Sequence, residues 1–191
     1  MEKENSIMLV VGLGNVGKDY EGTRHNVGFA VVDKVADILG LTFSDSKKLQ
    51  AKTAKGQNII LAKPVTFMNR SGLAVANLKG YYKLDVQNII IVSDDYNLDL
   101  GRVRIRRDGE SGGHNGLESV ISQLSGGFWR VRFGIGAVGN KKAEDFVLEK
   151  FKKDEAEIIS QVIDKTAHYL VDLLSKGELV NESINVGPRD V

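Results

Sequence analysis

Two short runs of almost wholly apolar residues constrain the fold of this chain more than any other feature of its sequence. They lie at residues 6–13 (SIMLVVGL) and 88–92 (NIIIV). Such runs are typical of strands buried on both faces, at the centre of a sheet that carries helices on each side. Strand-like and helical segments alternate along the chain, which predicts an α/β fold with a mixed, mostly parallel, twisted sheet flanked by helices.

The segments between and after these runs follow the same alternation. Apolar residues at helical spacing predict a helix at Val27–Leu39, closed by Gly40, and a long amphipathic helix at residues 154–174. The other expected elements are strands at residues 50–53, 58–63, 102–106 and 130–135, and helices at residues 66–82 and 115–124. The 191 residues are expected to form one domain over 1–191, with a loose tail at about 181–191.

The composition narrows the chemistry that is available. The chain has no cysteine, which excludes disulfides, thiolate metal sites and a cysteine nucleophile. Its net charge is only +1, so the charge of the whole chain does not predict a nucleic-acid-binding protein, although arginines cluster locally. The N-terminus carries both charge signs and no long apolar run, so we expect a cytoplasmic protein without a signal peptide or membrane span.

A glycine-rich turn follows the first apolar run. Residues 12–17 (GLGNVG) match the dinucleotide-binding pattern G-x-G-x-x-G, with Asp33 roughly twenty residues further on. In a dinucleotide-binding fold this turn opens directly into a helix, whose N-terminus receives the pyrophosphate. Here residues 18–24 (KDYEGTR) are polar and contain a glycine, and Asp33 lies inside the helical pattern. We therefore expect a plain glycine turn and no nucleotide cofactor.

Two further segments carry candidate functional side chains, each with a structural alternative. His25 lies in TRHN at a loop-to-helix junction, where a histidine can act as a general base or be a surface residue beside a helix cap. In residues 63–72 (KPVTFMNRSG), Thr66 can cap the following helix. That cap would leave the amide of Asn69 free to hold a carbonyl or a phosphate.

Acidic and glycine-rich residues follow the second apolar run. Asp94 and Asp95 come at the expected carboxyl end of a central strand, where α/β folds bind ligands and an aspartate can orient a histidine. Asn115, in the segment GGHNG, resembles one half of a capping box with Glu118, and its amide can equally approach a ligand. His168 falls in the last amphipathic helix and is expected to be structural.

Together, these segments resemble the bacterial peptidyl-tRNA hydrolase family. The family pattern is roughly GLGNPG..Y..TRHN.G, then KP.T[YF]MN.SG, then a strand ending in an acidic pair, then G.GGHNGL and R.RIGIG. This chain has GLGNVGKDYEGTRHNVGF, KPVTFMNRSG, IVSDDYNLDLG, GESGGHNGL and RVRFGIG in the same order, between Leu9 and about Phe151. Five motifs in one order make the resemblance specific.

The resemblance implies a monomeric esterase that frees tRNA from peptide without a metal or other cofactor. His25 would be the general base that draws a proton from water, and Asp94 would orient it. The residues implied to bind the peptide or the terminal nucleotide are Asn15, Tyr20, Phe67, Asn69 and Asn115. The amides of Asn69 and Asn115 would also position the water or stabilise the developing oxyanion.

The resemblance also gives a role to basic residues. Arg106 and Arg132, on the polar faces of alternating strands, would clamp the acceptor stem and 3′ CCA end of peptidyl-tRNA, including the 5′ phosphate. The alternatives are a non-catalytic RNA-binding relative of the same fold and a dehydrogenase, which NAD(P) binding would reveal. The departures from the family pattern are Val16, Ser93, Tyr96, Asn97, Asp108 and Glu110.

Overall fold

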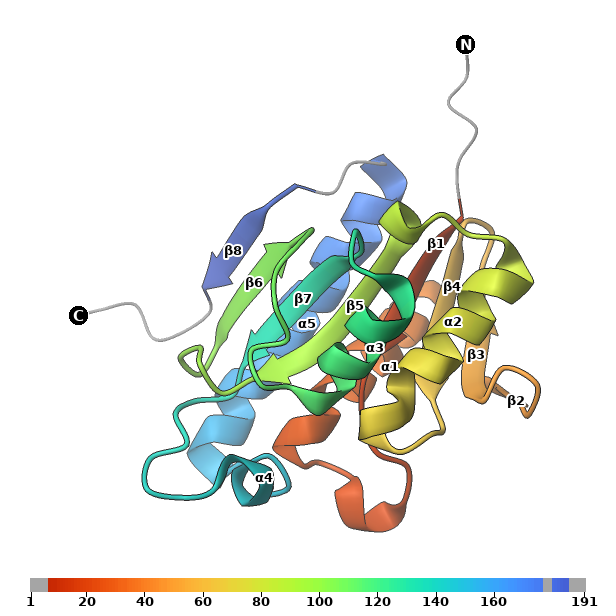
Figure 1. The fold of residues 1–191 in the computed structure, drawn as a ribbon. Helices are drawn as coiled ribbons and strands as arrows, with labels where there is room; N and C mark the ends of the chain where they lie inside the picture. Colours follow the sequence, from red (N-terminus) through yellow and green to blue (C-terminus); the bar gives the residue numbers. More distant parts are fainter. Residues whose placement is uncertain (1–6, 177–179, 186–191) are drawn as a thin grey trace.

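The computed structural model describes residues 7–176 and 180–185, which form one mixed sheet with helices on both faces (Figure 1). The strands are β1 (Met8–Gly12), β2 (Ser44–Ser46), β3 (Ala51–Lys55), β4 (Ile59–Pro64), β5 (Ile89–Asp95), β6 (Arg102–Arg106), β7 (Trp129–Gly134) and β8 (Glu182–Asn185). The α-helices are α1 (Val27–Leu39), α2 (Ser71–Tyr82), α3 (Asn115–Leu124), α4 (Ala143–Phe146) and α5 (Lys153–Lys176). The 3-10 helices are η1 (Lys18–Tyr20), η2 (Arg24–Asn26), η3 (Met68–Arg70) and η4 (Val86–Asn88).

The sheet has the strand order β2-β3-β4-β1-β5-β7-β6-β8. Its four central strands, β4, β1, β5 and β7, are parallel to one another. On either side, β3 and β6 pair antiparallel with this centre, and β2 and β8 pair antiparallel with β3 and β6. All described strands except β3 and β6 therefore point the same way, which confirms the expected mixed, mostly parallel sheet.

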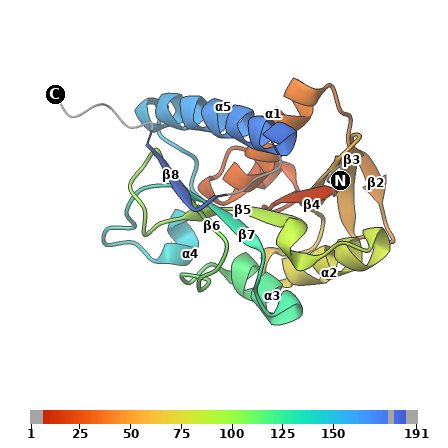
Figure 2. The same ribbon diagram turned by 90° about the horizontal axis from the view of Figure 1, so that it is seen from above.

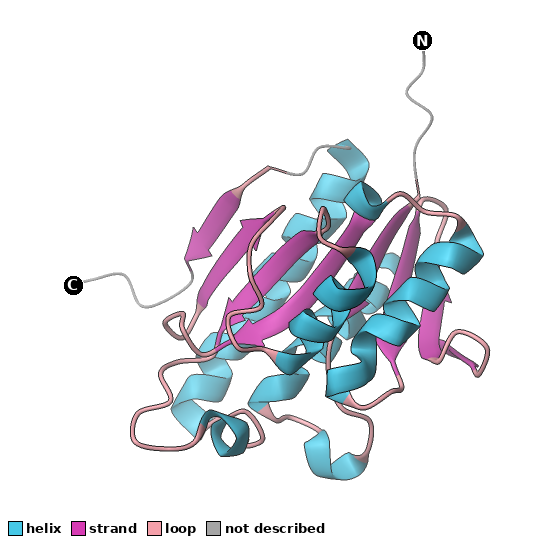
Figure 3. Cartoon of the chain, viewed as in Figure 1, coloured by secondary structure: helices cyan, strands magenta, loops and turns pink. Residues whose placement is uncertain are grey.

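Helices cover both faces of the central strands (Figures 2 and 3). α1 and α5 pack on one face, and α2 and α3 pack on the other. Along β5, Val92 belongs to the core beneath α1 and α5, whereas Ile91 belongs to the core beneath α2 and α3. Every residue of β5 is buried, which explains the unbroken apolar run in its sequence. None of the described helices combines the length and apolarity needed to cross a membrane.

The alternation predicted for β6 is confirmed. Val103 and Ile105 are fully buried in the core on the α5 side, and the arginines between them point to the opposite face. Arg132 of β7 pairs with Arg104 and therefore shares that face. In the described part of the chain, no helix covers this face of β6 and β8 (Figure 1). The sheet thus presents arginines beside α3.

Two expectations are corrected by the structure. Thr66 does not cap a helix, because the chain first forms η3, α2 begins only at Ser71, and the Thr66 hydroxyl has no hydrogen-bond partner among the described residues. The tail is not loose at residues 182–185, because β8 pairs with β6 there. The rest of the expected tail, residues 186–191, lies outside the described residues.

The glycine turn after β1 does not open into a helix. η1 and η2 separate it from α1, which begins only at Val27. Asp33 lies inside α1, where its carboxylate forms an ion pair with Lys63. A dinucleotide site would need a helix N-terminus at the turn and an acidic residue at the end of the next strand, so the turn is a plain one.

At Gly28, α1 closely approaches the residue after β1 and the middle of β5. A Cβ atom at this position would lie 2.5 Å from the carbonyl oxygens of Leu13 and Val92, so only glycine permits the approach. His25 and Asn26 directly precede α1. The contact at Gly28 therefore sets the distance between His25 and the carboxyl end of β5.

We predict that Gly28→Ala lowers the free energy of unfolding by about 1–3 kcal/mol, the usual effect of overpacking a filled site. Gly80→Ala in α2 is the matched control, because a Cβ atom there would meet nothing within 4 Å. The control should raise the free energy of unfolding by about 0.5–1 kcal/mol, because alanine favours helix. Urea unfolding measures both, and a stabilising Gly28→Ala would contradict the close contact.

Candidate active site

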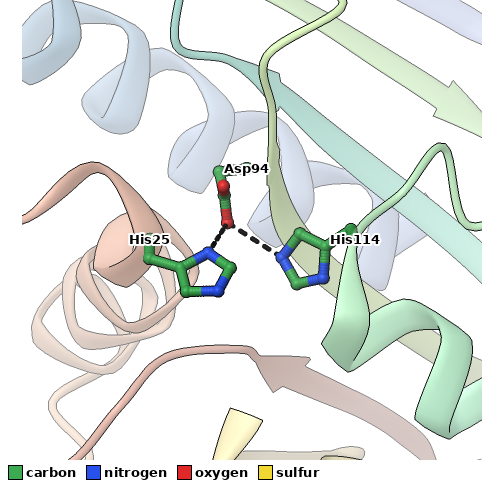
Figure 4. Close-up of side chains that lie close together, drawn as sticks. All are labelled: His25, Asp94 and His114. Atoms are coloured by element: carbon green, nitrogen blue, oxygen red, sulfur yellow. Dashed lines mark hydrogen bonds and ion pairs between the residues drawn. The ribbon is translucent and has the colours of Figure 1, made fainter. Parts of the chain in front are cut away.

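Two histidines converge on one carboxylate oxygen at the end of β5 (Figure 4). His25 Nδ1 lies 2.8 Å from Asp94 Oδ1, and His114 Nε2 lies 2.9 Å from the same oxygen. His25 comes from η2, Asp94 from β5, and His114 directly precedes α3. All three are buried, with exposed fractions of 8%, 1% and 5%. Segments distant in the sequence therefore meet in one buried cluster, which we call the His–Asp–His cluster.

The protonation of His114 follows from its second contact. Its Nδ1 accepts hydrogen bonds from the backbone N–H groups of Gly116 and Leu117, both at 3.1 Å, which makes His114 the N-cap of α3. An acceptor nitrogen carries no proton. His114 is therefore a neutral imidazole that donates its Nε2–H to Asp94. Asn115, which the sequence suggested as one half of a capping box, is the first residue of the helix instead.

The tautomer of His25 follows from the same carboxylate. A carboxylate oxygen can only accept, so His25 Nδ1 donates its hydrogen to Asp94 Oδ1. The other ring nitrogen, Nε2, has no hydrogen-bond partner among the described residues and retains its lone pair. Asp94 thus fixes the orientation of His25 and leaves the basic nitrogen free, as in sites where an aspartate supports a histidine base.

Asp94 remains ionised in this setting. Burial alone raises the pKa of the Asp94 carboxyl, but the nearby His114 and His25 imidazoles, with their two hydrogen bonds, outweigh burial. The pKa of Asp94 is therefore held well below its ordinary value of 3.8. A permanently charged carboxylate can stabilise the imidazolium that forms when His25 takes up a proton.

The cluster also has the composition of a metal site. The ligand atoms of His25, Asp94 and His114 all lie within 4.8 Å of one another. However, both nitrogens of His114 are engaged in hydrogen bonds, and one of them faces two backbone N–H groups. The separations of 2.8 and 2.9 Å are hydrogen-bond lengths, whereas two nitrogen or oxygen ligands of one tetrahedral zinc lie roughly 3.3 Å apart. The donor set does not fit a tetrahedral zinc ion.

A cavity of about 450 Å³ opens beside the cluster. Its lining includes all three cluster residues together with Tyr96 and Asn115, and residues of α4 and on either side of it also line the cavity. A larger cavity of about 850 Å³ lies between α1 and α5 but contains no residue of the cluster. We therefore take the smaller cavity as the candidate active site, because the His–Asp–His cluster lines it.

A second candidate cavity, of about 430 Å³, is lined in part by the loop that follows β1. Its lining includes Asn15, Tyr20 and Phe67, and the Phe67 ring is 77% exposed. Asn26 holds this loop next to the cluster, because its Oδ1 accepts from Asn15 N–H at 2.8 Å and its Nδ2 donates to Asn15 O at 2.9 Å. Asn69, in η3, is exposed and does not line either cavity.

The two candidate clamp arginines lie outside both cavities and already have partners within the chain. Arg132 Nε is 3.1 Å from Asp95 Oδ2, and its Nη2 donates to Ser111 O at 3.0 Å. Arg106 Nη1 donates to the carbonyl oxygens of Ile105 and Glu182, at 2.6 and 2.7 Å. Each guanidinium therefore has a structural role, and each keeps further N–H groups for a ligand.

The sequence prediction missed two residues of the site. His114 was part of a recognised segment, but only its neighbour Asn115 was given a role; a histidine directly before a helix was the available signal. Arg24 was not considered. It is almost fully buried, donates to Glu155 Oε2 at 2.7 Å and packs against the rings of Phe146 and Phe151. It anchors η2, and thus His25, to the start of α5.

The fold is that of an α/β protein, and its buried His–Asp–His cluster beside a cavity has the arrangement expected of a hydrolase with a histidine base oriented by an aspartate. The family model described as peptidyl-tRNA hydrolase matches residues 9–188. The chain belongs to the peptidyl-tRNA hydrolase family.

Individual relatives support this assignment. A peptidyl-tRNA hydrolase of Thermoanaerobacter sp. (strain X514) is 45% identical over 176 residues, which cover 88% of this chain and 94% of the relative. One from Clostridium botulinum (strain Hall) is 42% identical over 182 residues, covering 93% and 94%. The crystal structure of peptidyl-tRNA hydrolase from Acinetobacter baumannii superposes with a TM-score of 0.86 at 35% identity, covering 93% of this chain and 92% of that one.

We predict that Asp94→Asn flattens the acid dependence of stability. The folded-state pKa of Asp94 lies below 3.8, so its contribution is present above that pH and is lost as the pH falls. Between about pH 4 and pH 3, the free energy of unfolding of the wild type should fall by up to about 1.4 kcal/mol more than that of the variant. Urea unfolding at each pH measures this, with Asp99→Asn, at an exposed position, as the control. Parallel pH profiles for wild type and Asp94→Asn would contradict the depressed pKa.

Proposed function

We propose that this protein hydrolyses the ester bond between a peptide, or an N-blocked amino acid, and the 3′-terminal ribose of tRNA. The observation that carries the proposal is the free Nε2 of His25, held beside a cavity by the buried carboxylate of Asp94. Hydrolysis by this enzyme would return tRNA from peptidyl-tRNA that has left the ribosome. Its place of action would then be the cytoplasm, where translation occurs.

The reaction begins with a water molecule in the cavity beside His25. His25 Nε2 accepts a proton from this water as its oxygen attacks the ester carbonyl carbon, and Asp94 stabilises the resulting imidazolium. The tetrahedral intermediate then collapses, the bond to the ribose oxygen breaks, and His25 returns the proton to that oxygen. The products are a tRNA with a free terminal hydroxyl and a peptide carboxylic acid, which releases its proton to solvent and becomes a carboxylate. No covalent enzyme intermediate is needed.

Side-chain amides assist this step. Asn115 lines the same cavity as His25, and its N–H groups would stabilise the oxyanion that develops on the carbonyl oxygen. Asn15, Tyr20 and Phe67 line the second cavity, where they would bind the peptide or the terminal nucleotide, with the exposed Phe67 ring available for stacking. Asn69 lies on the exposed turn next to Phe67 and would act with it.

The acceptor stem would lie across the arginine-bearing face of β6 and β7. Arg106 and Arg132 both reach this face, and guanidinium groups bind phosphate oxygens through paired N–H groups. The face lies beside α3, whose N-cap is His114. A tRNA bound there would direct its 3′ CCA end toward the His–Asp–His cluster.

We predict that His25→Ala lowers kcat for N-acetyl-aminoacyl-tRNA by ~10²–10⁴-fold, because the general base is lost. His168→Ala is the matched control, since His168 is exposed on α5 and, among the described residues, its polar contacts are with Asp164 of the same helix. Release of tRNA is followed by acid precipitation, and circular dichroism verifies that both variants fold. If His25→Ala keeps most of its activity, the base has been misassigned.

We also predict that Arg106→Gln weakens tRNA binding in a salt-dependent way. Loss of one phosphate contact should reduce the slope of log K against log salt by about 0.7–0.9. Lys165→Gln removes the same charge from exposed α5, on the opposite side of the sheet, and should leave the slope unchanged. Equal slopes for wild type and Arg106→Gln, measured by filter binding of uncharged tRNA, would rule out the phosphate contact.

A further inference from the structure

The side chain of Arg132 is turned toward the interior of the protein. It is only 16% exposed, and its ion-pair partner Asp95 is 3% exposed. Its Nη2 lies against the loop before α3, where a Cβ atom at Gly112 would come within 2.0 Å of this nitrogen. The guanidinium thus occupies the space that a side chain at Gly112 would need. Such packing is typical of a structural support and not of a side chain held only for an incoming ligand.

The same loop is held from the end of β5. Asp95 Oδ1 accepts the backbone N–H of Asn97 at 2.8 Å, and Asn97 Nδ2 donates to Gly112 O at 3.2 Å. The Tyr96 hydroxyl lies 2.4 Å from where a Cβ atom of Gly113 would be. Asp95 is therefore linked to residues 111–113 by two series of polar contacts, one through Arg132 and one through Asn97.

These connections end at the catalytic cluster. The carbonyl oxygen of Ser111 accepts a hydrogen bond from Arg132 Nη2 at 3.0 Å and another from the backbone N–H of His114 at 3.2 Å. His114 in turn donates to Asp94, which orients His25. A continuous series of polar contacts therefore runs from Asp95 through Arg132 and Ser111 to the base.

We propose that Arg132, paired with Asp95, is a positioning residue for the chemical step. It sets the placement of residues 111–113, and through them the contact of His114 with Asp94 and the position of Asn115 in the cavity. This inference rests on the proposed function and deepens it, because it gives Arg132 a role in catalysis that does not require the tRNA acceptor stem.

A substrate without the acceptor stem separates the two roles. N-acetyl-aminoacyl-CCA, a trinucleotide ester, lacks the helix and its 5′ phosphate. We expect Arg132→Gln to lower kcat on this substrate by ~10–100-fold with little change in KM, as small misplacements of catalytic groups do. Arg132→Lys should behave similarly, because lysine keeps the charge but lacks the fork that spans Asp95 and Ser111. Asp95→Asn should give a comparable loss, and the double variant should not be additive.

Arg104→Gln is the matched control. Arg104 pairs with Arg132 across the strands and shares its face, but its side chain has no hydrogen bond or ion pair among the described residues. Its kcat on the trinucleotide ester should equal that of the wild type. The NMR signal of the His114 Nε2 proton should move in Arg132→Gln and Arg132→Lys and stay in place in Arg104→Gln.

The outcomes are distinguishable. If Arg132→Gln and Arg132→Lys keep wild-type kcat on the trinucleotide ester and an unmoved His114 signal, Arg132 serves only as a phosphate clamp and the positioning role is wrong. If the wild type hydrolyses neither the trinucleotide ester nor the full-length substrate, the proposed function fails. The His114 signal then decides the positioning role alone, because it reports the loop geometry without turnover.

Discussion

One carboxylate oxygen, Asp94 Oδ1, accepts hydrogen bonds from two imidazole rings in a site that is almost closed to solvent. Burying a charge is costly unless hydrogen bonds compensate, and here two N–H groups supply the compensation. The rest of the fold brings these donors into place. The glycine contact of α1 at Gly28 brings His25 to the end of β5, and the first turn of α3 fixes His114.

Much of the fold follows from patterns that depend on local sequence and burial alone. The apolar runs at β1 and β5 predicted central strands, because a strand covered on both faces has no position left for polar side chains. The alternation in β6 predicted one buried and one polar face. The outer elements were less predictable. β2 and α4 are too short to show a clear pattern, and β8 depends on its pairing with β6, which the sequence of β8 alone does not reveal.

In the candidate site too, residues placed by clear local patterns could be predicted, whereas residues placed by backbone geometry could not. His25 and Asp94 could be predicted because each lies at the end of an element whose type was clear, and the family resemblance supplied their pairing. His114 could not be assigned in this way, since its role depends on which residue caps α3, and Asn115 was an equally good cap by sequence. Thr66 failed for the same reason, because η3 comes before α2. Side-chain capping is decided by backbone geometry within one residue, which sequence patterns do not resolve.

The adjacent aspartates at the end of β5 link the two halves of the proposed activity. Neighbouring residues on a strand point to opposite faces, so Asp94 and Asp95 take different partners from one rigid position. Asp94 orients His25, the proposed base, and Asp95 holds Arg132, which belongs to the face proposed to bind the acceptor stem. Any shift of Arg132 toward a phosphate would act on Ser111, whose carbonyl it shares with the backbone N–H of His114. Under the proposed function, this path of direct contacts would couple the binding of the acceptor stem to the orientation of His25.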